Sequence, residues 1–279
     1  MATPQEEFKI ELPTVVDIAY EQYKRDLPKF KTTRDIMTPN VVTVTPEISL
    51  DSAAQLMGEK HIGSLIVTNY KTPVGIITER DLLSKVLAFG LFLTDEKVNE
   101  IMSYPLAGIS VNATIKEAAQ EMVHTKGRLA VFDAGKLAGI ITASDLIKSL
   151  PDVEETEAKI DDFMTKKVVT ADVNTSVINT AKIMGQNRIG SVIIAHKGEP
   201  FGIFTERDLL TSFLAKARPL FSDVGPECSQ PLVVIPAGTS VHRTAAAMAL
   251  KHIRRLPVVK DEKIVGIITA RDLVEAYAK

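Results

Sequence analysis

The stretch GIITERDL, residues 75–82, decides the fold, because near copies of it recur three times further along the chain. They read GIITASDL at 139–146, GIFTERDL at 202–209 and GIITARDL at 266–273. The threonines of the four copies, Thr78, Thr142, Thr205 and Thr269, recur at a nearly constant interval. Repetition at a nearly fixed spacing indicates four structural units, numbered 1 to 4 along the chain.

The four units form two pairs. Residues 41–83 and 168–210 align without a gap at an offset of 127, with 20 of 43 positions identical. The second and fourth motif threonines are separated by the same offset. The chain is therefore two copies of a two-unit module, and the acidic stretch PDVEETEAK at 151–159 is the natural boundary. We predict module 1 over 31–155, with units at about 34–89 and 98–150, and module 2 over 156–279, with units at about 160–215 and 222–279.

Within a unit the hydrophobic periodicity changes in a fixed order. VVTV (41–44) is typical of a short strand, and SLDSAAQLMGEK (49–60) spaces its apolar residues as a helix does. SLIVT and VGIIT are apolar strand runs, and ERDLLSKVLAF returns to helical spacing. Each unit therefore reads βαββα, and the fold class is α/β (α+β). Because about 50 residues is near the size at which a core becomes marginal, we expect the units to pair.

Residues 1–30 lie outside the repeats. Within them, LPTVVDIAYEQYKRDL (12–27) has apolar residues at helical spacing, which predicts an amphipathic helix. Such a helix would pack on its own domain or cover a partner.

The composition argues against several function classes. A net charge of −2 argues against a large nucleic-acid surface, and the single cysteine, Cys228, has no partner in the chain for a disulfide. The longest apolar run, at 86–93, is too short to span a bilayer. The chain has no P-loop, no G-x-G-x-x-G, no H-E-x-x-H and no histidines at metal-ligand spacing. We expect a cytoplasmic protein that is not an enzyme and uses neither a metal nor a membrane.

The Thr-x-x-Asp of the motif has two readings. Threonine after a strand, with an acidic residue three positions on, is the arrangement that caps a helix. A cap would also accept Ser, Asn or Glu at these positions, whereas all four units keep Thr and Asp. Since a helix N-terminus attracts anions and a short carboxylate binds a sugar diol, capping combined with ligand binding explains the pattern better than capping alone.

Basic residues recur near the second strand and inside the motif of the units. His61, Arg128, Arg188 and the pair Arg254–Arg255 precede the second strand, and Arg80, Arg207 and Arg271 lie inside the motif. The arginine fork matches phosphate oxygens. Together with Thr and Asp, these bases describe a pocket for a ribose phosphate.

These repeats resemble cystathionine-β-synthase (CBS) domains, and the resemblance covers about 34–279. Two such domains in tandem resemble a Bateman module, and the four together resemble the nucleotide-sensing γ subunits of AMP-activated protein kinase. The resemblance implies units paired by pseudo-twofold symmetry. It also implies ligand clefts between paired units, with ribose bound by Thr and Asp of one unit and adenine by the first strand of the other.

The resemblance implies four clefts when carried over by position. The first joins Ile76, Thr78, Arg80 and Asp81 to Leu106 and Ala107, with Arg128 near the phosphates. The second joins Ile140, Thr142, Ser144 and Asp145 to Val41 and Val42, with His61 near the phosphates. The third joins Ile203, Thr205, Arg207 and Asp208 to Leu232 and Val233, with Arg254 and Arg255. The fourth joins Ile267, Thr269, Arg271 and Asp272 to Val168 and Val169, with Arg188.

The clefts are not equal in charge. Ser144 replaces the motif arginine, and His61 stands where unit 3 has Arg188, so we expect the second cleft to bind phosphate most weakly.

The resemblance implies a sensor that binds AMP, ADP or ATP, requires no cofactor and acts on an unidentified partner protein. The apolar helices after the motifs could close a disc within one chain or join two chains as a homodimer. The alternatives are a scaffold with empty clefts, or a sensor of S-adenosylmethionine, NAD or nucleic acid.

Overall fold

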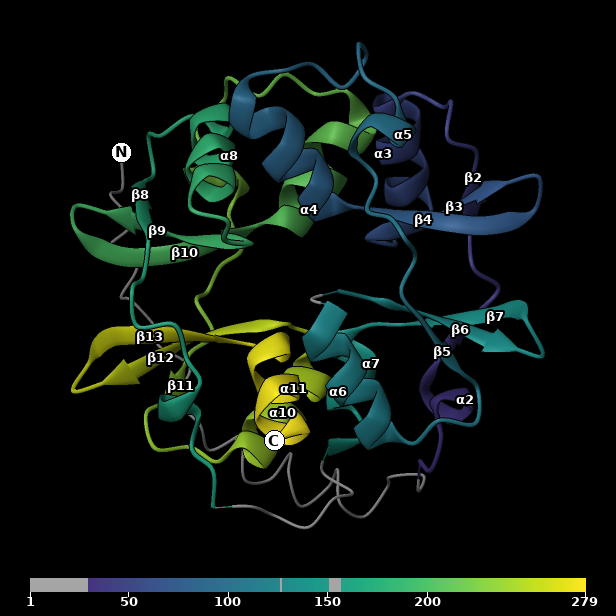
Figure 1. The fold of residues 1–279 in the computed structure, drawn as a ribbon. Helices are drawn as coiled ribbons and strands as arrows, with labels where there is room; N and C mark the ends of the chain where they lie inside the picture. Colours follow the sequence, from purple (N-terminus) through teal and green to yellow (C-terminus); the bar gives the residue numbers. More distant parts are fainter. Residues whose placement is uncertain (1–29, 126, 151–156) are drawn as a thin grey trace.

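Each repeat folds into a short strand, a helix, an antiparallel hairpin and a closing helix, as the periodicity predicts (Figure 1). The computed structural model describes residues 30–125, 127–150 and 157–279. The helix predicted within residues 12–27 and most of the linker at 151–159 fall outside these ranges. Among the described residues, no helix combines the length and hydrophobicity needed to cross a membrane.

Units 1 and 3 share one pattern of elements. Unit 1 comprises β2 (Thr43–Val44), α3 (Leu50–Glu59), β3 (Ser64–Asn69), β4 (Thr72–Thr78) and α4 (Glu79–Asp81), which continues through η1 (Leu82–Val86) and η2 (Leu87–Phe89). Unit 3 comprises β8 (Thr170–Asp172), α8 (Val177–Gln186), β9 (Ser191–His196), β10 (Glu199–Thr205) and α9 (Glu206–Asp208), which continues through η5 (Leu209–Phe213) and η6 (Leu214–Lys216). In both units the closing helix widens into one π-helical stretch just after the motif aspartate.

Units 2 and 4 close with ordinary α-helices. Unit 2 comprises β5 (Gly108–Ser110), α6 (Ile115–Thr125), β6 (Leu129–Asp133), β7 (Lys136–Ile141) and α7 (Ala143–Ile147). Unit 4 comprises β11 (Ile235–Pro236), α10 (Val241–Lys251), β12 (Arg255–Lys260), β13 (Lys263–Thr269) and α11 (Ala270–Ala278). The connections contain α2 (Thr33–Ile36), β1 (Thr38–Pro39), α5 (Val98–Ile101), η4 (Ile160–Asp162) and η7 (Gly225–Glu227).

Every unit has its own small sheet with the same register. The first strand pairs in parallel with the second, and the second and third strands form an antiparallel hairpin, as where Thr43 lies beside Ile66 and Ile66 beside Ile76. The first strand is shorter than predicted, because in unit 1 only Thr43–Val44 of the stretch 41–44 is in strand pairing. Strand β1 comes before β2 in unit 1 but adds to the sheet of unit 2, which ties the two units together.

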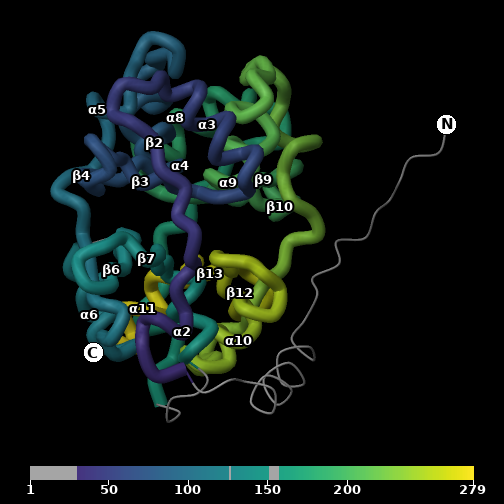
Figure 2. The backbone as a smooth tube through the Cα atoms, turned by 90° about the vertical axis from the view of Figure 1, so that its right-hand side faces the viewer, coloured from purple at the N-terminus to yellow at the C-terminus, as the bar shows by residue number. Residues whose placement is uncertain are grey.

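The sheets pair within a module, and the helices pair between modules. Ile66 and Ile76 of unit 1 pack with Ala130 of unit 2 between the two sheets, and residues of units 3 and 4 pack likewise. The closing helices cross between modules, so that Leu210 of unit 3 lies in the core of unit 1. The core of unit 2 is continuous with that of unit 4. Units 1 and 3 consequently form one layer and units 2 and 4 the other (Figures 1 and 2).

Small residues let the helices of units 1 and 3 approach closely. A Cβ at Gly58 in α3 would overlap the side chain of Ala215 in η6, and one at Gly185 in α8 would overlap Ala88 in η2. Apolar side chains after the motifs, such as Leu83, Leu87 and Leu210, therefore pack inside this chain, and a homodimer stays a prediction.

We predict that Leu210→Ala lowers the free energy of unfolding by about 2–5 kcal/mol, because the side chain is fully buried in the core of the opposite module. Urea denaturation would measure the change. The control is Leu250→Ala, at a leucine that is 43% exposed, which should change stability by less than about 1 kcal/mol. Equal losses in the two variants would contradict the packing of unit 3 into unit 1.

Candidate functional site

The Thr-x-x-Asp turns are helix caps. Thr78 Oγ1 accepts a hydrogen bond from the Asp81 N–H at 3.2 Å, and Asp81 Oδ2 accepts from the Thr78 N–H at 2.9 Å. The same reciprocal pair joins Thr205 to Asp208 and Thr269 to Asp272. The threonine hydroxyl also donates to that carboxylate oxygen in each unit. The capping prediction is confirmed, and the cap uses only one of the two carboxylate oxygens.

Unit 2 is capped less completely. Asp145 Oδ2 accepts from both the N–H and the hydroxyl of Thr142, at 2.9 and 2.7 Å. The Asp145 N–H donates to the backbone carbonyl of Thr142 at 3.0 Å, whereas elsewhere the corresponding N–H bonds to the threonine hydroxyl.

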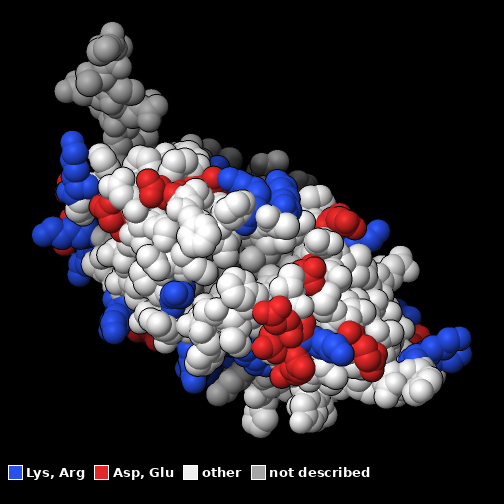
Figure 3. Space-filling model, turned by 90° about the horizontal axis from the view of Figure 1, so that it is seen from above, with Lys and Arg blue, Asp and Glu red and all other residues white. Residues whose placement is uncertain are grey.

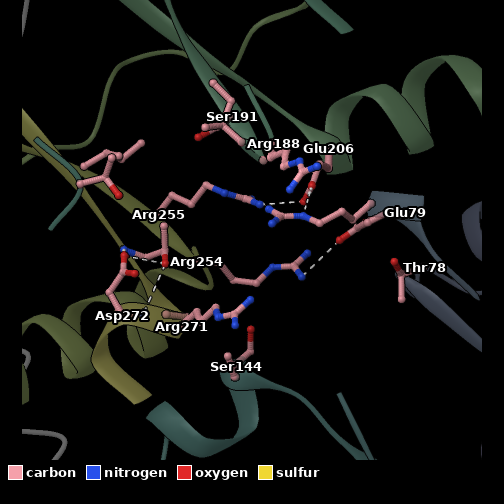
Figure 4. A pocket seen from close by; sticks show the side chains of 18 of the residues that line it. Thr78, Glu79, Ser144, Arg188, Ser191, Glu206, Arg254, Arg255, Arg271 and Asp272 are labelled. Carbon is pink, nitrogen blue, oxygen red and sulfur yellow. Dashed lines mark hydrogen bonds and ion pairs between the residues drawn. The ribbon is translucent and has the colours of Figure 1, made fainter. Parts of the chain in front are cut away.

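The fourth predicted cleft opens into a cavity of about 340 Å³. Its wall carries the motif turn of unit 4 and the residues just before the first strand of unit 3, and also residues of units 1 and 2 (Figure 4). The predicted lining residues found there are Ile267, Thr269, Arg271, Asp272, Val168, Val169 and Arg188. Burial raises the pKa of Asp272, although the hydrogen bonds from Thr269 act in the opposite direction.

The second predicted cleft is a cavity of about 240 Å³. The predicted residues found on its wall are Val41, Val42, Ile140, Thr142, Ser144 and Asp145. His61 is not among the residues that line it: it is exposed, in a left-handed turn at φ 54°, and Ile62 and Gly63 take its place. Three arginines, Arg128, Arg207 and Arg254, line the cavity in its stead. The cleft therefore has more arginines than its own two units supply, but still fewer than the six that line the fourth cavity, and its weak phosphate binding stays a prediction.

The motif aspartates of the first and third clefts are engaged within the protein. Asp81 Oδ1 lies 2.8 Å from Lys85 Nζ and accepts from Ser103 Oγ at 3.5 Å, so both oxygens of this carboxylate have partners. Asp208 Oδ2 accepts from both the N–H and the hydroxyl of Thr205, each at 2.8 Å, and burial raises the pKa of Asp208. Asp145 Oδ1 also lies near a lysine, Lys148 Nζ, but at the longer distance of 3.7 Å, so Asp81 is less available to a ribose than Asp145 and Asp272.

The first-strand residues predicted in pairs divide between two environments. Leu106, Leu232, Val41 and Val168 pack between the paired sheets, beside Ile76, Ile140 and Ile203. Ala107, Val233, Val42 and Val169 pack into the cores of their units. Alternation along an extended chain sends neighbouring side chains to opposite faces, so one side chain of each pair faces the partner unit.

Arg80, Arg207 and Arg254 form ion pairs between the modules, whereas Arg128 and Arg255 pair within their own module. Glu206 accepts from Arg80 Nε and from Arg255, each at 2.8 Å. Glu79 lies 3.5 Å from each of three arginines, Arg128, Arg207 and Arg254. Arg80 therefore lines the fourth cavity and Arg207 the second, not the first and third clefts to which the sequence assigned them. The reason is that the motif turns of units 1 and 3 meet at the centre, which no pattern within a repeat reveals.

Arg254 and Arg255 are also placed differently from the prediction. The sequence assigned both to the third cleft. Arg254 lines the second and fourth cavities, and Arg255 lines the fourth, where it points to Glu206 (Figure 4).

The centre carries a surplus of positive charge. Two glutamates, Glu79 at 6% and Glu206 at 5% exposure, meet five arginines, which leaves a formal excess of three positive charges. Burial lowers the pKa of Arg128, Arg207 and Arg255, as expected for cations removed from water. On the outer face formed by units 1 and 3, by contrast, both signs are interspersed (Figure 3). Surplus positive charge beside an enclosed cavity favours an anion.

Glu79 and Glu206 are the site residues that the sequence reasoning missed. They occupy the first variable position of the motif in units 1 and 3, where units 2 and 4 have alanine. Their N–H groups donate to the carbonyls of Gly63 and Gly190. A Cβ at Gly63 would lie 2.8 Å from a Glu79 oxygen, and one at Gly190 would overlap the Arg255 guanidinium. The alternation of glutamate in units 1 and 3 with alanine in units 2 and 4 is the sequence pattern that could have identified these two residues.

The model of the CBS domain family matches residues 34–88, 98–152, 160–215 and 222–279, which is most of the chain. The chain belongs to the CBS domain family. As a four-domain member it has the Bateman arrangement, with two paired units in each module.

Similar proteins support this assignment. An uncharacterized protein of Methanocaldococcus jannaschii, MJ1404, is 30% identical over 265 residues, which are 88% of this chain and 61% of that protein. The crystal structure of MJ1225 from the same organism, proposed to be an archaeal homolog of the γ subunit of AMPK, superposes with a TM-score of 0.72. That match has 24% identity and covers 88% of this chain and all of the other. Hypoxic response protein 1 of Mycobacterium tuberculosis is 33% identical over 123 residues, covering 43% of this CBS protein and 86% of the relative.

We predict that Glu206→Gln lowers the free energy of unfolding at pH 7 by about 2–4 kcal/mol, because Arg255 loses a buried partner. This predicted loss in the free energy of unfolding is smaller than for a fully buried ion pair, because Arg80, the second partner of Glu206, is 47% exposed. Burial raises the pKa of Glu206, but Arg255 and Arg80 outweigh it and the folded pKa is lowered from 4.5. The stabilisation is therefore present above pH 4.5 and is lost as the pH falls through the folded pKa. Urea denaturation between pH 7 and 3 should show the two proteins converging in acid, and a constant gap would exclude the ion pair as its cause.

Proposed function

We propose that this CBS protein is a non-catalytic regulatory protein that binds an adenine nucleotide, AMP, ADP or ATP, and passes the signal to a partner protein. The observation that carries the proposal is the fourth cavity. It brings a capped Thr269–Asp272 turn, an apolar strand and several arginines to one enclosed space. Its volume of about 340 Å³ lies within the range of roughly 300–1,000 Å³ that is typical of small-molecule sites.

Each part of a nucleotide meets suitable chemistry there. The Asp272 carboxylate spends one oxygen on the helix cap, and its other oxygen is available to ribose hydroxyls. Val168 and Ile267 offer apolar surface for a base. Arg188 and Arg271 offer guanidinium forks for phosphate, and the helix N-terminus at Ala270 adds a favourable dipole.

The arrangement of the units suits regulation. The walls of this cavity come from all four units, so a ligand contacts both modules at once. A ligand shifts a conformational equilibrium only through differential affinity for its states, and a ligand that touches every unit can differ in affinity when their packing changes. The fold shared with MJ1225, itself proposed to be related to γ-AMPK, agrees with this role. Ligand-induced repacking would be read by the partner protein.

We predict that Asp272→Ala weakens AMP binding at least tenfold, because ribose hydroxyls lose a charged acceptor. Isothermal titration calorimetry with AMP on the full chain would measure the affinity. Asp81→Ala is the matched control: it removes the corresponding cap, but Asp81 is already engaged by Lys85, so AMP affinity should stay within about twofold.

Two results would contradict the proposal. If AMP, ADP and ATP leave the melting temperature of the wild-type protein unchanged at millimolar concentration, the cavity is not a site for adenine nucleotides. S-adenosylmethionine and NAD should be tested in the same way. If only one of them raised the melting temperature, that compound, and not an adenine nucleotide, would be the ligand. A ligand at about a hundredfold its Kd stabilises by about 2.7 kcal/mol, which is readily detected.

A further inference from the structure

Glu79 and Glu206 occupy matching positions but are held differently. Both are buried at the centre, and they correspond to each other in the alignment of the two modules. Glu206 makes two bonds of 2.8 Å to Arg80 and Arg255, which is the distance of strong charge-assisted pairs. The ion pairs of Glu79 are all 3.5 Å long, and its Oε2 makes no hydrogen bond to the described residues although it is buried. Glu206 is firmly clamped, whereas Glu79 is loosely held.

The two sets of charged residues differ at one position in the sequence. The same alignment places Arg80 opposite Arg207 and Arg128 opposite Arg255, so each glutamate has two symmetric arginine partners. Arg254 is the exception, because its counterpart in module 1 is Gly127. Glu79 therefore faces three arginines, from units 2, 3 and 4, and is the carboxylate that must be shared.

These three arginines are also the positive wall of the second cavity. Arg128, Arg207 and Arg254 all line it, together with Ser144 and the Asp145 turn, whereas Glu79 itself is not among its lining residues. Glu79 contacts these arginines and lines the fourth cavity instead. Glu79 neutralises one of the three positive charges, and Asp145, which also lines the cavity, reduces the formal excess to one.

We propose that Glu79 is an internal competitor for the anionic end of a ligand in the second cavity. Without a bound anion it holds the three arginines, and a bound phosphate group takes them over in part, since carboxylate and phosphate are alternative acceptors for the same guanidinium forks. Glu79 sets the anion affinity of this cavity and connects it to unit 1. That Glu79 regulates the binding of a nucleotide rests on the proposed function. The competition between Glu79 and an anion applies to any phosphate-like anion.

The test is isothermal titration calorimetry of the full chain with inorganic pyrophosphate at low ionic strength. Glu79→Gln should bind pyrophosphate about tenfold more tightly than wild type, because it removes one negative charge next to the anion. Glu227→Gln is the matched control: it breaks the surface ion pair with Arg218 and changes the net charge equally, and its affinity should equal that of wild type.

Two further variants locate the effect. Arg207 lines the second cavity and is not among the residues lining the fourth, so adding Arg207→Gln to Glu79→Gln should abolish the gain. Arg254→Gly restores the symmetric arrangement and should weaken pyrophosphate binding relative to wild type. If Glu79→Gln fails to fold, Glu79→Asp can replace it. The shorter side chain keeps the negative charge but holds it further from the arginines, so about a threefold gain in pyrophosphate affinity is expected.

The competition is overturned if Glu79→Gln, or Glu79→Asp in its place, binds pyrophosphate no more tightly than wild type, if neither protein binds it, or if the gain survives Arg207→Gln. Because pyrophosphate carries no adenosine, these outcomes are independent of the AMP titrations. A protein that ignores adenine nucleotides but gains pyrophosphate affinity in Glu79→Gln would refute the proposed nucleotide and retain the competitor.

Discussion

The burial of two glutamates among five arginines is the constraint on which the rest of the structure depends. Taking carboxylates out of water is costly unless each is paired, and pairing here requires arginines from other units. Glu79 and Glu206 therefore fix how the motif turns of units 1 and 3 meet. The helix packing, with glycines at Gly58 and Gly185, brings the turns close enough for these contacts. The two cavities are the space left beside this charged centre.

The sequence allowed the fold to be predicted because the determinants of the fold are local. The periodicity of one unit predicts its strands and helices, and the reciprocal bonds of Thr78 and Asp81 follow from their spacing alone. The division between two modules follows from the gapless alignment of the first and third units. Only the length of the first strand was overestimated, since Val41 and Val42 precede the pairing in β2.

The candidate site was predicted less well, because it depends on how one module faces the other. Repeats indicate which residues correspond, but they carry no information about which copies meet. The turns of Asp145 and Asp272 were placed correctly relative to their partner strands, yet Arg80 and Arg207 were assigned to the clefts of their own turns. Arg80 and Arg207 lie in the first turn of α4 and α9, and their long side chains can reach in more than one direction, so tertiary packing decides their partners.

The glycine at position 127 and the arginine at 254 have a consequence for what a fused chain can do. Two separate copies of one module, joined by twofold symmetry, would present identical halves, and any substitution would appear twice. In a single chain the halves can diverge at one position without the other changing. Arg254 opposite Gly127 is such a divergence at the charged centre. Covalent duplication thus lets one protein carry two cavities of different electrostatic strength, a property closed to a symmetric dimer of the same module.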